Sequence, residues 1–282
     1  MSKVPVIEQC AVSNHYNEDV LIERLEDYLV RNDNLVFPHR HNFYHITLFE
    51  SGNGSHIIDF EDFQIEPWQI YFMSPGQIHT WNFEGEVKGY VINFHKDLFK
   101  NHLLRSDYLS NFSFFSGLVR DEVFTVPQAD RALIVELIER LCDKQLPKEY
   151  IISSLLFIFH LLNNNRESTY SFEPSVYNHT LLRNFLNLIE ANFKSLRLPK
   201  DYAALLYITP NHLNALCKEF LGHPAGELIR DRVILEAKRL LVIKDYSISE
   251  IAYDLNFNDN SYFTKFFKKA VGITPEEFRK CI

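Results

Sequence analysis

The chain has 282 residues, 46% hydrophobic and 23% charged, a composition typical of a soluble globular protein. A chain of this length can form two domains with separate cores. Its apolar runs are too short to span a bilayer, and its start, MSKVPVIEQC, lacks the hydrophobic core of a signal peptide. Its four cysteines form no CxxC pair, which argues against a structural zinc site. We therefore expect a cytoplasmic protein with no membrane partner.

The net charge of −8 argues, taken alone, against a nucleic-acid partner. The charge is unevenly distributed, because residues 176–282 carry 15 Lys and Arg against 12 Asp and Glu, a balance of +3. Residues 1–175 carry 14 basic and 25 acidic residues, a balance of −11. A mildly basic C-terminal third on an acidic body is compatible with a segment that faces phosphates.

Residues 35–95 contain short segments rich in Ile, Val, Phe and Tyr, separated by turns that contain glycine. Examples are HITLFES (45–51), SHIIDF (55–60), WQIYFMS (68–74) and KGYVINF (88–94). Many short strands with such turns predict a β-sandwich or a β-barrel.

Two helical segments are predicted after the strands, at 128–144 and 149–162. The second is apolar on most sides, whereas the first carries a stripe formed by Leu133, Leu137 and Leu141. This stripe suits either the pairing of two copies of the chain or packing within one copy.

The stretch 164–176 is polar, contains a proline and lacks any hydrophobic period, so we predict a linker there. It divides the chain into an N-terminal domain at 1–163, a β-barrel with appended helices, and an all-α domain at 177–282.

The C-terminal domain contains an internal repeat, because residues 202–222 and 251–272 share one pattern with an offset of 50 across their second halves. Each copy has a short helical segment, a tight polar turn and a second helical segment that ends at a glycine. This pattern predicts a helix-turn-helix unit, whose second helix can enter a major groove. We predict two units at about 200–222 and 248–272, joined by a helix at about 224–242.

The stretch NSYFTKFFKKAVG (260–272) shows how the second helix divides into two faces. Helical spacing predicts a buried stripe of Phe263, Phe266, Phe267 and Ala270. The same spacing predicts an outward row of Ser261, Thr264, Lys265 and Lys268. Asp259 or Asn258 suits the N-cap of this helix, and Pro210 suits the first turn of the equivalent helix in the first unit.

The C-terminal domain resembles the AraC/XylS family of bacterial transcription regulators over roughly 100 residues. The resemblance is carried by the PxxL start at 210–213, IRDRVILEAKRLL (229–241), ISEIAYDLNF (248–257) and above all YFTKFFKKAVGITPEEFR (262–279). It implies that outward positions of the two second helices read bases and hold phosphates. These DNA-binding positions are Asn211, Asn214, Ala215, Lys218, Ser261, Thr264, Lys265 and Lys268.

Three positions depart from the family pattern, in which Ala215 is commonly arginine, Cys217 a larger hydrophobic residue and Asn256 frequently glycine. Ala215 indicates that the first unit forms fewer hydrogen bonds with bases. A lysine such as Lys265 can donate to guanine O6 and N7, and an asparagine such as Asn211 can pair with adenine. Lysines such as Lys218 and Lys268 are suited to phosphates, unless they are ordinary solvated side chains.

The N-terminal domain resembles the cupin barrels that precede many DNA-binding domains of this family. HxH occurs in VFPHRHNFYHITLFESGNG (36–54) and PGxxH in WQIYFMSPGQIHTW (68–81). The resemblance implies an all-β, cupin-like fold that encloses a small-molecule effector. Because strands alternate their faces and the register is open, each inward candidate has core packing or an outer face as its alternative. The effector-binding candidates are Phe37, His39, His41, Tyr44, His45, Tyr71, His79 and Trp81.

A metal site is an alternative for four of these residues, His39, His41, His45 and His79, because imidazoles bind iron, zinc and nickel. His45 stands where metal-binding cupins usually carry glutamate. Regulatory cupins keep similar histidines without a metal, so we assign neither a metal nor a cofactor.

These patterns predict a sequence-specific DNA-binding transcription regulator, controlled by a small-molecule effector, and not an enzyme. Its expected partners are promoter half-sites in double-stranded DNA, the effector and a second copy of the chain, with RNA polymerase as a further candidate. Two alternatives stay open. A metal-dependent cupin enzyme fused to a DNA-binding domain requires a bound metal, and an effector-independent DNA binder is expected to be nearly indifferent to sequence.

Overall fold

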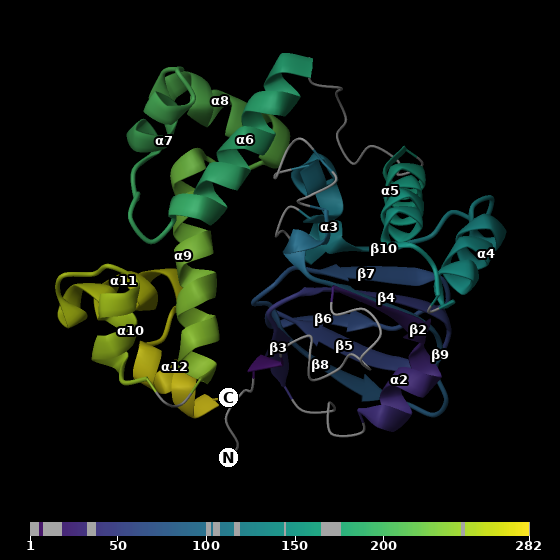
Figure 1. Ribbon diagram of the computed structural model, residues 1–282. Coiled ribbons are helices and arrows are strands. Elements are labelled where there is room, and N and C mark those ends of the chain that lie inside the picture. The colour runs from purple at the N-terminus through teal and green to yellow at the C-terminus, as the bar shows by residue number, and fades with distance from the viewer. Residues whose placement is uncertain are drawn as a thin grey trace. The chain divides into compact units, whose positions relative to one another are not determined.

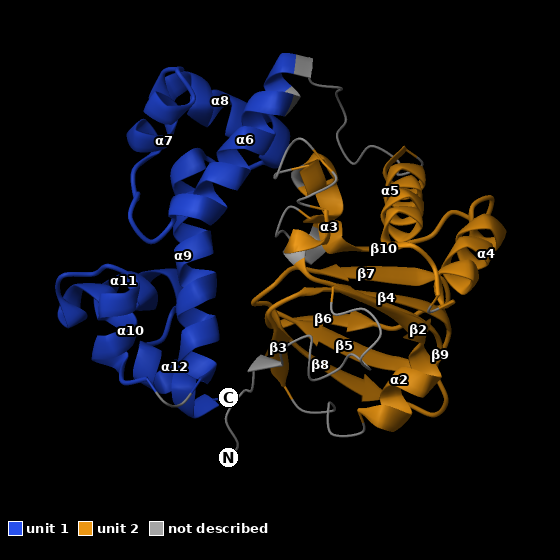
Figure 2. Ribbon diagram, viewed as in Figure 1, with its two compact units in different colours: residues 1–4, 168–282 blue, residues 5–167 orange. Residues whose placement is uncertain are grey.

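The computed structural model describes residues 6–7, 19–32, 38–99, 103, 108–115, 119–143, 145–164, 176–243 and 246–281. The described residues of 5–167 form one compact unit and those of 168–282 another, called here the N-terminal and C-terminal units (Figure 2). Strands dominate the N-terminal unit, and the described elements of the C-terminal unit are all helices (Figure 1). The predicted fold class, a β-rich domain followed by a helical domain, is confirmed. The predicted linker lies almost wholly outside the described residues.

The N-terminal unit contains two five-stranded sheets. The first has the order β1 (Val6–Ile7), β3 (His39–His41), β8 (Ile78–Phe83), β5 (Gly54–Ile58) and β6 (Glu61–Gln64). The second has the order β10 (Val123–Thr125), β7 (Gln69–Met73), β4 (Tyr44–Ser51), β9 (Lys88–Phe94) and β2 (Val20–Arg24). Apart from the parallel pair of β1 and β3, the strand pairs of the described residues are antiparallel.

Alternation along the strands gives the unit two apolar layers. On β4, His45 and Thr47 point to the same side as Phe49, which belongs to the core enclosed by the two sheets. Ile46 and Leu48 point to the other side, where α4 (Arg131–Leu141) and α5 (Lys148–Asn164) cover the second sheet. Shorter elements complete the unit: α2 (Leu25–Arg31), α3 (Val119–Glu122) and the 3₁₀ turns Lys96–Leu98, Tyr108–Asn111 and Ser113–Phe115.

The C-terminal unit consists of seven described helices. They are α6 (Val176–Asn192), α7 (Pro199–Leu205), α8 (Pro210–Leu221), α9 (Ala225–Val242), α10 (Ile248–Asp254), α11 (Asn260–Val271) and α12 (Pro275–Cys281). The pairs α7–α8 and α10–α11 lie along α9, each as a short helix followed by a longer one (Figure 1). None of the described helices in either unit combines the length and hydropathy that a membrane-spanning segment needs.

Matching caps begin and end the two longer helices, α8 and α11. The Thr209 hydroxyl accepts a hydrogen bond from the backbone of the third residue of α8, and the Asp259 carboxylate accepts two from the first turn of α11. Gly222 and Gly272 end these helices with left-handed φ angles of 76° and 92°. The predicted N-cap at Asp259 and the predicted glycine ends are confirmed.

The turn between the two helices of each pair contains a residue in the left-handed region. Tyr207 has a φ of 56° and Asn256 a φ of 59°. Asparagine tolerates this conformation better than most residues other than glycine, which explains how Asn256 replaces the glycine common in the family. Tyr207 holds the same conformation while its side chain is 97% exposed.

Two arginines connect separate helices of the C-terminal unit. Arg232 on α9 donates from Nε to both carboxylate oxygens of Glu190 on α6, at 2.7 and 2.9 Å, and its guanidinium lies 4.0 Å from the ring centroid of Phe193. Arg197, which precedes α7, donates to the backbone carbonyl of Leu255 at the end of α10. The two helix pairs are therefore held in one framework.

The buried stripe predicted for α11 is only partly present. Phe263 and Phe267 are fully buried, but Phe266 is half-buried. Ala270, in the last turn of α11, is exposed.

Phe263→Ala is expected to destabilise the C-terminal unit by about 3–5 kcal/mol, because the change leaves a cavity in its core. Urea unfolding followed by far-UV circular dichroism reports the helices. The matched change Tyr262→Ala, at a side chain that is 61% exposed, is expected to cost less than about 0.5 kcal/mol. Similar losses for the two variants would contradict the assignment of Phe263 to the core.

Candidate functional site

Helix α8 presents three of its four predicted DNA-binding positions to solvent. Asn211, Ala215 and Lys218 are exposed, whereas Asn214 is half-buried. In the described part of the chain, Lys218 makes no ion pair, so its ammonium group is available to an external anion.

The Asn214 side chain has a structural partner. Its Oδ1 accepts a hydrogen bond from the backbone N–H of Ala225, the first residue of α9, at 3.1 Å. First-turn N–H groups have no partner within their own helix, so Asn214 satisfies one that α9 cannot. This bond uses one of the two acceptor positions of Oδ1 and directs the amide toward α9, so the structure gives Asn214 a connecting role between α8 and α9.

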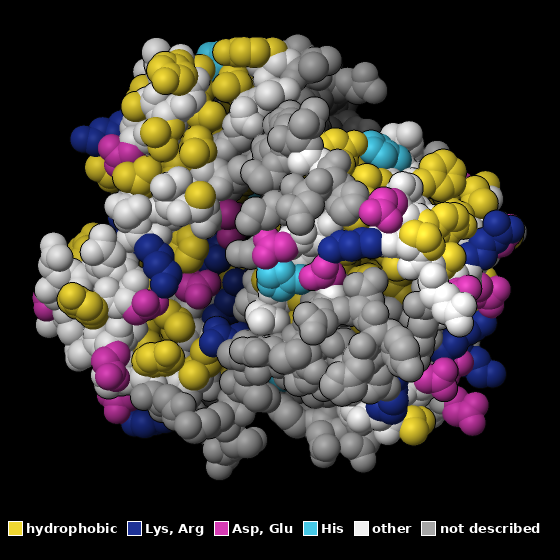
Figure 3. Space-filling model, in the orientation of Figure 1, with side chains coloured by type: hydrophobic (Ala, Val, Ile, Leu, Met, Phe, Trp, Pro, Cys, Tyr) yellow, Lys and Arg dark blue, Asp and Glu magenta, His cyan; other side chains and the backbone are white. Residues whose placement is uncertain are grey.

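Helix α11 offers a richer surface. Ser261, Lys265 and Lys268 are exposed and Thr264 is half-buried. Neither lysine forms an ion pair with any described carboxylate. On the face of the molecule drawn in Figure 3, basic and acidic side chains are interspersed within each unit, and no broad basic patch is visible. The exposed cations that these two helices offer to an anion include Lys218, Lys265 and Lys268.

Sequence reasoning missed one exposed pair on these helices. His212 lies in the first turn of α8, and Tyr262 occupies the equivalent place in α11 at the 50-residue offset of the repeat. Both side chains are exposed. A comparison of every outward position in one helix with the position 50 residues away would have identified them.

The interior of the N-terminal unit contains a cluster of five histidines from four strands. His39 and His41 come from β3, His45 from β4, His56 from β5 and His79 from β8. All are at most 3% exposed. The pairing of β3 with β8 sets His39 directly opposite His79.

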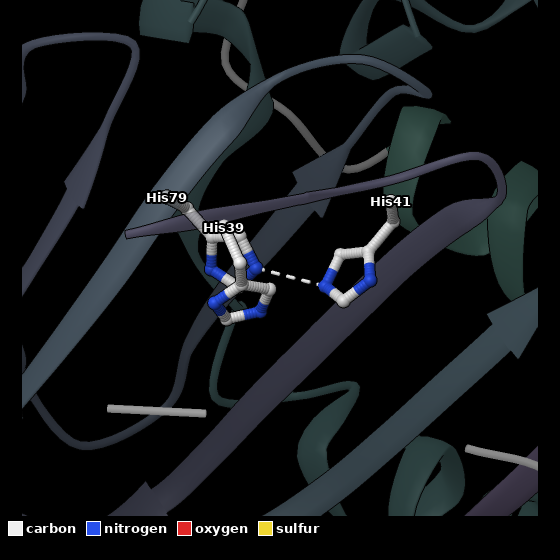
Figure 4. Close-up of side chains that lie close together, drawn as sticks. All are labelled: His39, His41 and His79. Carbon is white, nitrogen blue, oxygen red and sulfur yellow. Dashed lines mark hydrogen bonds between the residues drawn. The ribbon is translucent and has the colours of Figure 1, made fainter. Parts of the chain in front are cut away.

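Hydrogen bonds link these imidazoles to one another. His41 Nε2 lies 2.8 Å from His79 Nε2, and His79 Nδ1 lies 3.1 Å from His56 Nε2 (Figure 4 shows the first of these bonds). His45 Nε2 lies 2.9 Å from the Thr47 hydroxyl. The Nδ1 atoms of His41 and His56 have no hydrogen-bond partner among the described residues.

The rings fill the space in which they meet. The centroid of His79 lies 4.2 Å from that of His39, 4.9 Å from that of His41 and 5.4 Å from that of His45. These separations are those of rings in direct contact. An organic ligand must therefore displace rings to enter this point of the interior, whereas a single ion needs only small rotations.

Burial keeps four of the five imidazoles uncharged. It lowers the pKa of His41, His56 and His79 well below 6.5, and the neighbouring imidazoles lower each pKa further. Burial and the nearby His39 also lower the pKa of His45, to about 3. These four rings are therefore neutral near pH 7, the state in which imidazole binds metals.

The structure brings most of the predicted effector residues together. His39, His41, His45, His79, Tyr71 and Trp81 lie in the interior between the sheets. Tyr44 does not, because it neighbours His45 on β4 and points to the opposite face, where it packs on Phe94. Phe37 lies outside the described residues.

His56 was not predicted as a site residue. Within SHIIDF it alternates with the exposed Ile57, which is the pattern of an inward-facing residue. Three of these histidines, His39, His41 and His79, can each offer one nitrogen such that the three atoms lie within 4.8 Å of one another. They are the group in the described chain that could hold a metal ion.

The three leucines predicted to pair two copies of the chain differ in exposure. Leu133 is 40% exposed, Leu137 is half-buried and Leu141 is only 4% exposed. Leu141 therefore packs within the chain, which is the alternative that the sequence left open. On α5, Tyr150 and Phe157 add exposed apolar surface at 40% and 51%.

Two family models match the chain. A model described as the AraC-like ligand-binding domain matches residues 28–159, and one described as a helix-turn-helix domain matches residues 202–280. The HTH-type transcriptional activator RhaR of Escherichia coli (strain K12) is 21% identical over 271 residues, covering 95% of this chain and 90% of that protein. RhaR of Shigella flexneri matches over the same shares, also at 21% identity.

Solved structures also align with the chain. Unsaturated fatty acid bound ToxT of Vibrio cholerae strain SCE256 has 14% identity and a TM-score of 0.42, covering 95% of this chain and 97% of its own. The C-terminal domain of the response regulator yesN of Fusobacterium nucleatum has 28% identity and a TM-score of 0.33, covering 36% of this chain and 98% of its own.

Acidification is expected to destabilise the N-terminal unit. Below about pH 6.5 an unfolded chain protonates its histidines while the buried ones stay neutral, so each such histidine lowers the free energy of unfolding by about 1.4 kcal/mol per pH unit. Both tryptophans, Trp68 and Trp81, lie in this unit, so their fluorescence during urea unfolding in EDTA reports it. His56→Gln is expected to reduce the slope by one histidine, and an unchanged slope would contradict the neutral state of His56.

Asn214→Ala is expected to lower the free energy of unfolding of the C-terminal unit by about 1 kcal/mol, because the first turn of α9 loses a capping partner. Circular dichroism during urea unfolding measures this change. Asn211→Ala, at an exposed position of the same helix, is the control and is expected to change stability by less than about 0.5 kcal/mol. Equal effects would rule out a special connecting role for Asn214.

Proposed function

Because the chain belongs to the AraC family of transcription regulators, we propose that α8 and α11 read promoter half-sites under the control of an effector bound in the N-terminal unit. The observation that carries the proposal is the pair of capped second helices, each of which presents an exposed lysine without an ion pair. On the face drawn in Figure 3, basic and acidic side chains are mixed, so the proposal rests on these individual lysines.

We assign the principal base readout to α11. Lys265 is exposed at the middle of the helix, where an ammonium group can donate to guanine O6 and N7. Ser261 and Thr264 supply hydroxyl groups beside it. Lys268, one turn further on, holds a phosphate and contributes affinity without sequence information.

We assign a smaller share of the readout to α8. Asn211 pairs with adenine, and Ala215 contacts a thymine methyl group. Lys218 holds a phosphate, and His212 joins this surface from the first turn. The half-buried Asn214 amide is directed to Ala225 by one hydrogen bond, which supports the weaker hydrogen-bond readout expected of the first helix-turn-helix unit.

The effector site lies among the inward side chains of the two sheets: His39, His41, His45, Tyr71, His79 and Trp81. Their nitrogens and hydroxyl groups suit a hydroxylated or anionic small molecule. Because the rings are in contact, the effector enters by displacing some of them, and this movement is the differential interaction that regulation requires.

We further propose that two copies pair through α4 and α5. The exposed Leu133, Tyr150 and Phe157 support this surface, with Leu137 at its edge. A paired regulator presents four helix-turn-helix units to two half-sites, and contact with RNA polymerase follows once it is bound upstream of a gene. The chain acts by binding and not by catalysis, in the cytoplasm where its DNA lies.

Lys265→Ala is expected to weaken binding to a specific site by about 1–3 kcal/mol and to relax its sequence preference. Full-length protein is titrated with duplexes from upstream of its own gene and with a randomised pool, at fixed salt. Lys280→Ala, which removes a charge from α12 in the same unit, is expected to leave the preference intact. Lys268→Ala is expected to reduce the salt dependence by about one unit of slope without changing preference.

Equal affinity of the wild type for every duplex would overturn base reading. Unchanged preference in Lys265→Ala would move the readout to another side chain of α11 or to α8.

A further inference from the structure

We propose that the N-terminal unit binds one divalent transition-metal ion through His39, His41 and His79. The proposal goes beyond DNA recognition by α8 and α11, and its test does not depend on DNA binding. It gives a second role to three of the histidines that are assigned above to the effector site.

The backbone brings the three donors together. His39 and His41 lie two residues apart on β3 and therefore point to the same side of the strand. His79 lies opposite His39 on the neighbouring β8. Figure 4 shows the three imidazoles converging, with the Nε2 atoms of His41 and His79 facing each other at 2.8 Å.

The distances fit an ion with imidazole ligands. Three donor nitrogens, one per residue, lie within 4.8 Å of one another. Tetrahedral ligands about 2.1 Å from zinc are about 3.4 Å apart. Side-chain rotations that move the donor nitrogens by on the order of 1 Å therefore complete the site. The hydrogen bond between His41 Nε2 and His79 Nε2 is replaced by one bond from each nitrogen to the ion. This requires that the proton between them leaves the donating Nε2, either for the Nδ1 atom of the same ring or for solvent.

A positioning residue for the ligand His79 is already in place. His79 binds the ion through Nε2, so its proton lies on Nδ1 and donates to His56 Nε2, 3.1 Å away. Metal-binding histidines characteristically donate their second nitrogen in this way, which fixes both tautomer and ring orientation. His56 is fully buried, and its own pairing with His79 requires no rearrangement.

The ligand set selects the class of ion. Neutral imidazoles suit Zn²⁺, Co²⁺, Ni²⁺ and Fe²⁺ rather than Mg²⁺ or Ca²⁺, which prefer oxygen. The three ligands contribute no negative charge, so the bound ion retains its full charge and its fourth position favours water or an anionic group. His45 lies beside the group, with its ring stacked on that of His41 at a centroid distance of 4.9 Å.

The test uses full-length protein without a histidine tag, stripped with EDTA and titrated with Co²⁺, whose visible absorption reports nitrogen ligands directly. We expect one equivalent to bind per chain and Zn²⁺ to displace it. His79→Gln is expected to abolish the signal, and His56→Gln to weaken binding about 10–100-fold. His95→Gln is the matched control, because this partly exposed histidine of the same unit lies outside the cluster.

A second readout on the unmodified chain guards against variants that fail to fold. Zn²⁺ is expected to raise the temperature at which the tryptophan fluorescence of the N-terminal unit reports unfolding, because an ion bound only to the folded state stabilises it. A folded wild type that binds neither Co²⁺ nor Zn²⁺ overturns the proposal. Undiminished binding in a folded His79→Gln variant, or loss of binding in His95→Gln, also overturns it by placing the ion elsewhere.

Discussion

The antiparallel pairing of β3 with β8 is the constraint on which the interior of the N-terminal unit depends. It sets His39 opposite His79, and the alternation along β3 then directs His41 into the same space. A slip of one residue between these strands would turn one set of imidazoles outward and leave the interior without its polar cluster. The pairing of β5 with β8 adds His56 from the other side. The chemistry of the interior is thus a consequence of register.

The two helix-turn-helix units share one framework but not one surface. Both second helices begin at an oxygen cap and end at a left-handed glycine, and α9 separates them. In α8, however, Asn214 is directed to the first turn of α9, and Ala215 offers only a methyl group. In α11 the equivalent of Ala215 is Lys265, which is exposed and cationic. A duplicated fold therefore presents two chemically different helix surfaces.

Sequence patterns predicted the helices and their ends because caps, periodicity and glycines act over a few residues. Asp259 is an example, since its role requires only the turn that follows it. His39 and His79 were found through short motifs. Tyr44 was misplaced and His56 missed because facing is decided by strand register, which depends on partners distant in sequence. The capping role of Asn214 was hidden for a similar reason, since Ala225 lies in the next helix.

The hydrogen bonds that join His41, His79 and His56 have a direction. A neutral imidazole carries one N–H group and one bare nitrogen, so His79, which uses both, must donate to one neighbour and accept from the other. The row of three rings therefore has two polarities, which differ only in where the protons lie. A group that donates a hydrogen bond to His41 Nδ1 favours one polarity, and a group that accepts one from it favours the other. The two polarities also differ in the proton position on His56, whose ring lies 4.8 Å from that of Tyr71 in the opposite sheet.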